Sequence, residues 1–210
     1  KHREAERLFL AEGTAVLEEA RSAPVQIFDS EEQLRRVSTL TTPSGPVGVF
    51  PFLDVTASEL LASVGRVVLL QGVQDPGNVG TAIRSAHAFG AGVALSRGSA
   101  DLYNPKTVRA TMGSIFHTPV ARELESLDFL RVAGSAGFGL VAAVPEAGVT
   151  PESLPRGRLV VCIGAEGSGL PEEVIRACEM EVGIPSLAPS LNASVAASIL
   201  LYEAYSRVLP

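Results

Sequence analysis

Cysteine and histidine are scarce in this chain of 210 residues. The two cysteines, Cys162 and Cys178, belong to no C-x-x-C pair, and the three histidines are scattered along the sequence. A metal site requires several such ligands at characteristic spacings, so the sequence predicts no metal centre. We interpret the cysteines as free thiols that are buried or half-buried.

Long apolar runs are also absent. Runs such as VVLL from Val67 and VAASILL from Val195 end well before the ~18 residues that a membrane-spanning helix needs. The sequence starts with the charged KHREAER and shows no apolar signal segment. We therefore expect a cytoplasmic protein without a membrane partner.

An excess of positive charge is missing as well, since the formal net charge is -6 at pH 7. This value alone disfavours a nucleic-acid partner, but the charges are unevenly distributed. Between Arg66 and Arg122, both included, six basic residues occur with two acidic ones, Asp75 and Asp101. A phosphate backbone responds to the local potential, so an RNA partner is not excluded. A solvated surface would produce the same count.

Alternating strand and helix patterns are present throughout, and 46 % of the residues are hydrophobic, as in globular proteins. In the first quarter we expect strands at 8–13, 25–30 and 47–53, helices at 14–23 and 31–37, and a turn at 41–46. These elements predict a small α/β domain that ends near Leu53, followed by a linker to about Val64. The first domain is therefore assigned to residues 1–64.

The remainder, residues 65–210, alternates more regularly and is assigned to a second domain. Continuous aliphatic runs predict buried strands at 67–71, 92–96, 138–144, 158–164 and 181–185. Helical patterns occupy 82–89, 105–116, 126–135, 171–178 and the final segment, and Gly90 is placed to end the first of them. Strands that are apolar on both faces predict a parallel sheet covered by helices on both sides, so the fold class is α/β.

One loop of the second domain, QGVQDPGNVGTAIRSA, leaves a buried strand and enters a helix. Ligands gather at this position in parallel α/β sheets. Asn78 is placed to cap the helix, which would make the loop an ordinary turn. Arg84 does not fit that interpretation, because a cation in the first turns of a helix is disfavoured by the helix dipole unless an anion binds nearby. The loop matches neither the G-x-G-x-x-G fingerprint nor the phosphate loop G-x-x-x-x-G-K-[ST].

A second loop, VCIGAEGSGL, leaves a strand through Gly164 and carries the carboxylate Glu166. Its glycines allow a ligand to approach the backbone closely, although the loop taken alone has an equally good structural interpretation.

A third loop, IPSLAPSLNASV, leads into a long apolar helix through Ser190, Asn192 and Ser194. Capping accounts for one such side chain. Two or three of them together exceed what capping requires, so the third loop is a further candidate for ligand binding.

Four motifs, in their order along the chain, closely resemble those of the SpoU-type (TrmH-like) RNA 2′-O-ribose methyltransferases of the SPOUT superfamily. They are DPGNVGTAIRSA, DLYNPKTVRATMGSIF, IGAEGSGL, and IP followed by SLNASVAASILLYEA. The resemblance covers Arg66 to about Arg207, and LFLAEGTAVLEEA and TTPSGPVGVF are less closely similar to that family's substrate-binding domain. It implies a Rossmann-like parallel-sheet domain with a C-terminal trefoil knot, preceded by a small α/β RNA substrate-binding domain. It also implies a homodimer that uses S-adenosylmethionine as cofactor.

The resemblance carries roles onto individual positions of this sequence. The catalytic set that it implies is Arg84, Asn78, Glu166, Ser190 and Asn192. The cofactor-binding set that it implies is Gly164, Ile184, Leu191 and Ser194. The family's proposed role of Arg84 as a base competes with a role as a clamp for the adjacent phosphate, because a guanidinium with a pKa above 12 retains its proton.

The implied activity is the S-adenosylmethionine-dependent methylation of a ribose 2′-hydroxyl in RNA. We expect rRNA rather than tRNA, because an added small domain is commoner among the family's ribosomal enzymes. The third loop departs from the family pattern: SLAP between Pro185 and Ser190 is shorter than the usual spacer and lacks glycine. A non-catalytic RNA-binding relative therefore stays open as an alternative. A dinucleotide-dependent oxidoreductase is a further alternative, but it would require a glycine fingerprint that is missing here.

Overall fold

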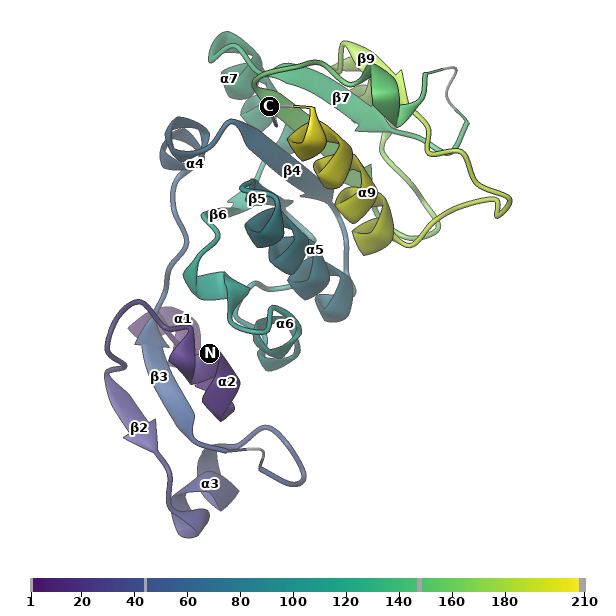
Figure 1. Cartoon of the computed structure of the whole chain (residues 1–210). Coiled ribbons are helices and arrows are strands. Elements are labelled where there is room, and N and C mark those ends of the chain that lie inside the picture. Colours follow the sequence, from purple (N-terminus) through teal and green to yellow (C-terminus); the bar gives the residue numbers. More distant parts are fainter. Residues whose placement is uncertain (1, 44, 147–148, 208–210) are drawn as a thin grey trace.

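The computed structural model describes residues 2–43, 45–146 and 149–207, which contain two β-sheets (Figure 1). Three parts of the predicted elements and domains lie outside the described residues. They are Ser44 of the predicted turn at 41–46, residue 1 of the first predicted domain, and residues 208–210 of the second. Among the described helices, none is long and apolar enough to cross a membrane.

The first sheet has three antiparallel strands in the order β1-β3-β2. They are β1 (Leu8–Glu12), β2 (Gln26–Phe28) and β3 (Val47–Pro51), and they are accompanied by α1 (His2–Glu6), α2 (Thr14–Glu18) and α3 (Glu31–Val37). Helix α3 has the predicted bounds because Ser30 caps it and accepts a hydrogen bond from the Gln33 N–H. We call α1 to β3 the N-terminal unit, which lies at one end of the molecule in Figure 1.

The second sheet has six parallel strands in the order β6-β5-β4-β8-β7-β9. They are β4 (Arg66–Gln71), β5 (Gly92–Ser96), β6 (Val120–Leu124), β7 (Gly139–Ala143), β8 (Leu159–Gly164) and β9 (Met180–Val182). The predicted parallel sheet is confirmed. The sequence did not predict edge strand β6, whose VAREL pattern lacks the continuous apolar run of a buried strand.

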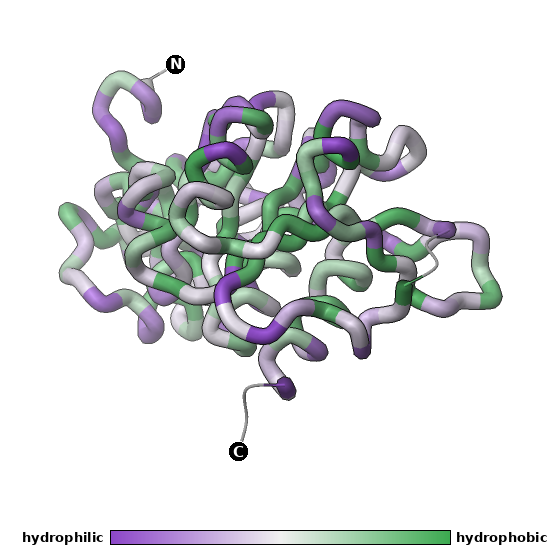
Figure 2. Tube along the Cα trace, turned by 90° about the horizontal axis from the view of Figure 1, so that it is seen from above, coloured by the Kyte–Doolittle hydropathy of each residue, from purple (hydrophilic) through white to green (hydrophobic). Residues whose placement is uncertain are grey.

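Helices cover both faces of this sheet. They are α4 (Ala57–Ser63), α5 (Pro76–Ala88), α6 (Pro105–Ala110), α7 (Ser126–Ser135), α8 (Glu172–Arg176) and α9 (Ala193–Ser206), with short 3₁₀ turns at Ser114–Phe116 and Pro151–Ser153. Along β4, Val68 and Leu70 join the core with α5 and α9, while Val67 and Leu69 join the core with α4, α7 and α8. Figure 2 shows hydrophobic segments running through the interior and many of the strongly hydrophilic ones at the outer turns.

Helix α4 occupies the stretch for which the sequence predicted a linker. Thr56 and Glu59 form a capping box at its start, and Leu60 and Leu61 are buried against the six-stranded sheet. The T-x-x-E spacing followed by two leucines was a readable helix signal. This correction places α4 with the second sheet, and we call α4 to α9 the sheet unit.

The two cysteines are free thiols, as predicted. Cys162 is buried in β8 and Cys178 is half-buried after α8, with their sulfur atoms 3.7 Å apart. The hydrogen bond with Cys178, together with burial, raises the pKa of the Cys162 thiol, whereas the same hydrogen bond lowers the pKa of Cys178. The two thiols share this one hydrogen bond.

An aromatic cluster joins the N-terminal unit to the sheet unit. The ring centroids of Phe9 and Tyr103 are 4.9 Å apart, and those of Phe50 and Phe116 are 4.8 Å apart. All four side chains are buried in one continuous core. The hydrophobic core therefore extends across the boundary between the units.

Candidate active site

A cavity of about 630 Å³ opens where the carboxyl ends of β7, β8 and β9 meet the start of α9. The residues that line it include six of the predicted site residues: Gly164, Glu166, Ile184, Ser190, Leu191 and Asn192. The second and third loops thus converge although they are separated in sequence by a helix and a strand. Their juxtaposition agrees with the rule that ligands bind at the carboxyl edge of a parallel sheet.

The first loop is connected to the cavity through Asn78, which is not itself among the described lining residues but contacts Glu166 and Asn192, which are. Helix α5 begins at Pro76 with Asp75 as its N-cap, and the Asp75 carboxylate accepts a hydrogen bond of 2.9 Å from the Asn78 N–H. The expectation that Asn78 caps the helix is therefore wrong. Because Asp75 performs the capping and Pro76 suits the first helical position, the amide of Asn78 is available for other contacts.

The Asn78 side chain bridges the second and third loops. Its amide nitrogen donates to the carboxylate of Glu166, which as an ionised acid can only accept. Its oxygen accepts hydrogen bonds from the Asn192 amide nitrogen at 2.9 Å and from the Ser194 hydroxyl at 3.2 Å. One amide thereby links three segments that are far apart in the sequence.

Asn192 is the N-cap of α9, and its side chain has two functions. Its oxygen accepts hydrogen bonds from the backbone N–H groups of Ser194 at 2.9 Å and Val195 at 3.3 Å. Its nitrogen donates to Asn78. Capping uses only the oxygen, so the nitrogen is available for a contact outside the helix.

Ser190 and Ser194 are placed differently from each other. Ser190 is exposed and lines the cavity. Ser194 is buried, and the one hydrogen of its hydroxyl is shared between the Asn192 oxygen at 2.7 Å and the Asn78 oxygen at 3.2 Å. Ser194 is absent from the residues that line the cavity over the described chain. Its position favours support of the asparagine pair over the direct cofactor contact that the sequence suggested.

Arg84 stands apart from the cavity. Six residues beyond Asn78 correspond to roughly 9 Å along the helix axis and about 240° around it, which turns Arg84 outward. Its side chain is exposed, and Arg84 is not among the described cavity-lining residues. The dipole argument for Arg84 is wrong, because α5 starts at Pro76 and Arg84 therefore lies in the second half of the helix.

Gly164 is required by the fold of its own loop. A Cβ atom at this position would lie 2.2 Å from the carbonyl carbon of Gly169. Gly169 also pairs with Ala165, to whose oxygen its N–H donates at 2.9 Å. The loop therefore folds back on itself and holds Glu166 near its tip. The close approach that the sequence assigned to a ligand is made here by the protein backbone.

One wall of the cavity was not predicted. It is formed by Ala143, Val144, Pro145 and Thr150, at and after the end of β7. These residues form no recognisable motif. Their signal was topological, because β7 pairs with β8 in parallel and its carboxyl end must lie at the same edge of the sheet.

The shape of the cavity suits a nucleoside-sized ligand. Its volume falls within the ~300–1,000 Å³ that is usual for small-molecule sites. Ile184, Leu191 and Ala196 supply apolar surface for a flat heteroaromatic ring, and backbone groups at the strand ends are available to its polar edge. Among the described residues, no cluster of three or more potential metal ligands is present.

Comparisons with known proteins place these features in a family. The sequence matches the model of the SpoU rRNA Methylase family over residues 65–202. It is 32% identical to the 23S rRNA (guanosine(2553)-2'-O)-methyltransferase RlmP of Bacillus subtilis, over 97% of this chain and 90% of that protein.

Two solved structures are similar over nearly the whole chain. The AdoMet-bound rRNA methyltransferase from Sinorhizobium meliloti has a TM-score of 0.87 and 30% identity, with 100% of this chain and 91% of that chain covered. The SpoU methyltransferase AviRb from Streptomyces viridochromogenes, in complex with the cofactor AdoMet, has a TM-score of 0.81 and 27% identity, with 98% and 92% covered. The chain belongs to the SpoU rRNA methylase family.

Proposed function

We propose that this protein transfers a methyl group from S-adenosylmethionine to a ribose 2′-hydroxyl of rRNA. The observation that carries the proposal is the cavity between the Glu166 loop and the start of α9, tied together by Asn78. Membership of the SpoU family and the similarity to two AdoMet-bound structures support it. The name of the Bacillus subtilis relative favours rRNA over tRNA.

The cavity residues fit S-adenosylmethionine. We assign Ile184 and Leu191 to its apolar walls, and Gly164 to the backbone edge beside them. The bound cofactor would supply a methyl group that its sulfonium has already activated. The protein then has to align the ribose hydroxyl with that methyl group and help to remove one proton.

We assign the polar groups to alignment. Asn78 holds the Glu166 carboxylate, while Asn192 and Ser190 supply an amide and a hydroxyl to the lining of the cavity. The Ser194 hydroxyl contacts the side-chain oxygens of both asparagines and keeps them next to each other. Because these groups are fixed before RNA arrives, they need little reorganisation during the reaction.

Arg84 is proposed to bind the RNA phosphate next to the reacting ribose. Its guanidinium is exposed, and a guanidinium matches a phosphate with two parallel hydrogen bonds. Since Arg84 lies outside the cavity, this role requires RNA or a second subunit to connect Arg84 to the reaction.

A homodimer would make such a connection. Val195, Ile199 and Tyr202 are exposed apolar residues of α9, with 45, 36 and 57 % of their surfaces accessible. Their spacing places them on one helix face. We propose that a second copy of the chain covers this face of α9, a helix that packs against α5, the helix of Arg84.

The proposed trefoil knot concerns the C-terminal segment. β9 lies at the sheet edge beside β7, whereas α9 packs on α5 and on β4 and β8 in the middle of the sheet. Residues 183–192 therefore run back along the cavity between these two positions. This return path supports the threading that the family resemblance implies.

We also keep the predicted division of labour between two domains, with residues 1–64 binding RNA and residues 65–210 carrying out methyl transfer. The separate three-stranded sheet supports the division, while α4 moves the structural boundary to about residue 54. We propose a cytoplasmic location because ribosomal RNA is the proposed substrate.

The test combines cofactor binding with methyl transfer. Calorimetry measures binding of S-adenosylmethionine, and radiolabelled cofactor measures transfer to an unmodified 23S rRNA transcript and to unmodified tRNA. Arg84→Ala should bind the cofactor within twofold of the wild type and lose at least 100-fold in transfer rate, about 3 kcal/mol of transition-state stabilisation. Arg84→Lys should retain part of the transfer rate, because lysine keeps the positive charge but lacks the paired N–H donors of the planar guanidinium.

Arg131→Ala, which removes an exposed arginine of α7 on the opposite face of the sheet, is the matched control. Unchanged transfer by Arg84→Ala would remove the role of Arg84. Cofactor binding by the wild type without transfer to any RNA would instead favour the non-catalytic relative. Transfer to tRNA alone would correct the substrate.

A further inference from the structure

The connection between the N-terminal unit and the sheet unit is anchored at both ends. Residues 52–56 lead from β3 to α4. The Phe52 N–H donates a hydrogen bond of 2.9 Å to the oxygen of Arg7, in the N-terminal unit. The Val55 N–H donates one of 2.9 Å to the oxygen of Val120, in β6 of the sheet unit. Only Leu53 and Asp54 stand between these anchors.

The hydroxyl of Tyr103 holds the two residues between the anchors. It accepts hydrogen bonds from the N–H groups of Leu53 and Asp54, the latter at 2.7 Å, and donates one of 2.7 Å to the Asp54 carboxylate. A tyrosine hydroxyl has one donor and two acceptor sites, so all are used. Burial raises the pKa of Tyr103, and the bond to Asp54 raises it further, so the hydroxyl remains a donor.

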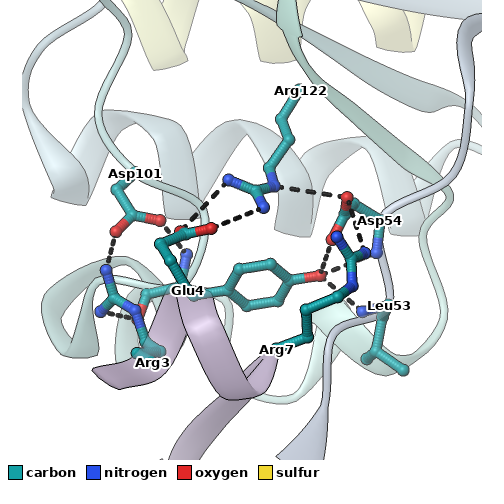
Figure 3. Close-up of polar contacts among 8 residues, drawn as sticks. Arg3, Glu4, Arg7, Leu53, Asp54, Asp101 and Arg122 are labelled. Carbon is teal, nitrogen blue, oxygen red and sulfur yellow. Dashed lines mark hydrogen bonds and ion pairs between the residues drawn. The ribbon is translucent and has the colours of Figure 1, made fainter. Parts of the chain in front are cut away.

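The Asp54 carboxylate lies between a cation from each unit (Figure 3). Its Oδ2 is 3.3 Å from Nε of Arg122, in β6, and 3.6 Å from Nη2 of Arg7, next to β1. Burial alone would raise the pKa of Asp54, but the Tyr103 hydrogen bond and the charges of Arg122 and Arg7 outweigh burial and lower it. Asp54 is therefore ionised under all conditions in which the protein would work.

Stacked rings complete the junction. Phe52 stacks on Tyr103, with centroids 3.8 Å apart and planes at 11°. The guanidinium groups of Arg122 and Arg7 lie 5.0 and 5.4 Å from the centroid of the Phe52 ring. These cation–π contacts add to the ion pairs. Both units and their connection thus share one set of short-range contacts, which fixes the angle between the two sheets.

We infer that Tyr103 and Asp54 are positioning residues for methyl transfer, which act by holding the N-terminal unit at a fixed orientation to the cavity. The inference rests on the proposed function. An RNA that contacts both units delivers its ribose to the cavity only while their relative orientation is maintained. A loosened junction lowers the fraction of molecules in that orientation, and the apparent affinity for RNA falls by the same fraction.

Tyr103→Phe tests this role because it removes the hydroxyl and retains the stacking ring. Hydrogen exchange read by mass spectrometry should become at least tenfold faster at the amides of Leu53 and Asp54. Transfer to the 23S rRNA transcript should lose about tenfold in kcat/KM, mainly through KM for RNA, since two backbone hydrogen bonds are lost. Binding of S-adenosylmethionine should stay within twofold. Tyr205→Phe, in α9, is the matched control.

A merely structural role would lower cofactor binding and RNA methylation together. If Tyr103→Phe does not fold, the same measurements are made on Asp54→Asn. This substitution keeps the shape of the side chain and removes the negative charge between the two arginines. Unchanged exchange, or unchanged kcat/KM with faster exchange, would overturn the inference while leaving the proposed function intact. If the wild-type protein methylates no RNA, both the inference and the proposed function are overturned. Only this last outcome bears on the proposed function.

Discussion

The bridge between Asn78 and Glu166 yields a sharp prediction for cofactor binding. Asn78→Asp keeps the size of the side chain and its oxygen acceptors for Asn192 and Ser194, but replaces the nitrogen that donates to Glu166. Two carboxylates then lie at hydrogen-bond distance. We expect them to repel, so that the Glu166 loop opens and the cavity loses a wall.

The magnitude follows from the separation and the exposure. Two unit charges about 3 Å apart repel by roughly 1.4 kcal/mol in water and about 5 kcal/mol at an effective dielectric constant of 20. Glu166 is exposed and Asn78 is half-buried, so the lower figure applies. The affinity for S-adenosylmethionine should therefore fall by about tenfold at pH 8.

The sign of the pH dependence is also fixed. A like charge raises the pKa of one carboxyl group in such a pair. Below that raised pKa, the pair shares a proton, the repulsion disappears and a hydrogen bond between the loops returns. The difference in affinity between Asn78→Asp and the wild type should therefore shrink as the pH falls from 8 to 5. Calorimetric titration of both proteins over this range measures it.

Gln74→Glu provides the control, because it adds a carboxylate to the same exposed loop without changing the Asn78 bridge. It should bind the cofactor like the wild type. If Asn78→Asp binds as tightly as the wild type at pH 8, or if its defect is independent of pH, the bridge does not hold the cavity closed and our reasoning fails.

Two further predictions concern packing. Ile199→Asp places a charge on the exposed face of α9 and should convert a dimer into a monomer in light scattering, whereas an unchanged mass would contradict the proposed dimer face. Gly80→Ala should lower the free energy of unfolding by about 1–2 kcal/mol, measured by urea unfolding. The added Cβ would lie 2.5 Å from the Cβ of Ala110 in α6, and the cost of this clash exceeds what alanine gains in helix propensity. Gly134→Ala in α7, where the nearest atom is 3.6 Å away, should be neutral or stabilising, and equal effects at both sites would contradict the close crossing of α5 and α6.

The sequence predicted local elements best where one signal dominated. Helix α3 has its predicted bounds because Ser30 precedes a uniform helical pattern. The start of α5 was missed because Asp75 and Asn78 both suit an N-cap, and Pro76 decides between them by occupying the first helical position. Helix α4 was missed because its T-x-x-E start, followed by two leucines, was not taken as a helix signal, and the stretch was interpreted as a linker.

The site depended on information that no local pattern contains. The family resemblance placed Glu166 and Asn192 in one catalytic set, and both of them line the cavity. Strand order was not predictable in this way, so the wall after β7 was missed. The placement of Arg84 was also missed, because the direction of a helical side chain depends on where its helix begins.

The asparagine at the start of α9 thus has an explanation that connects the helix with the site. The backbone N–H groups at the start of α9 need an acceptor, and the oxygen of Asn192 supplies it. A serine or aspartate would cap equally well, but neither has an amide nitrogen to donate to Asn78. Asn192 therefore starts the helix and joins it to Asn78 with the same side chain. Formation of α9 and assembly of the site are therefore coupled through one side chain.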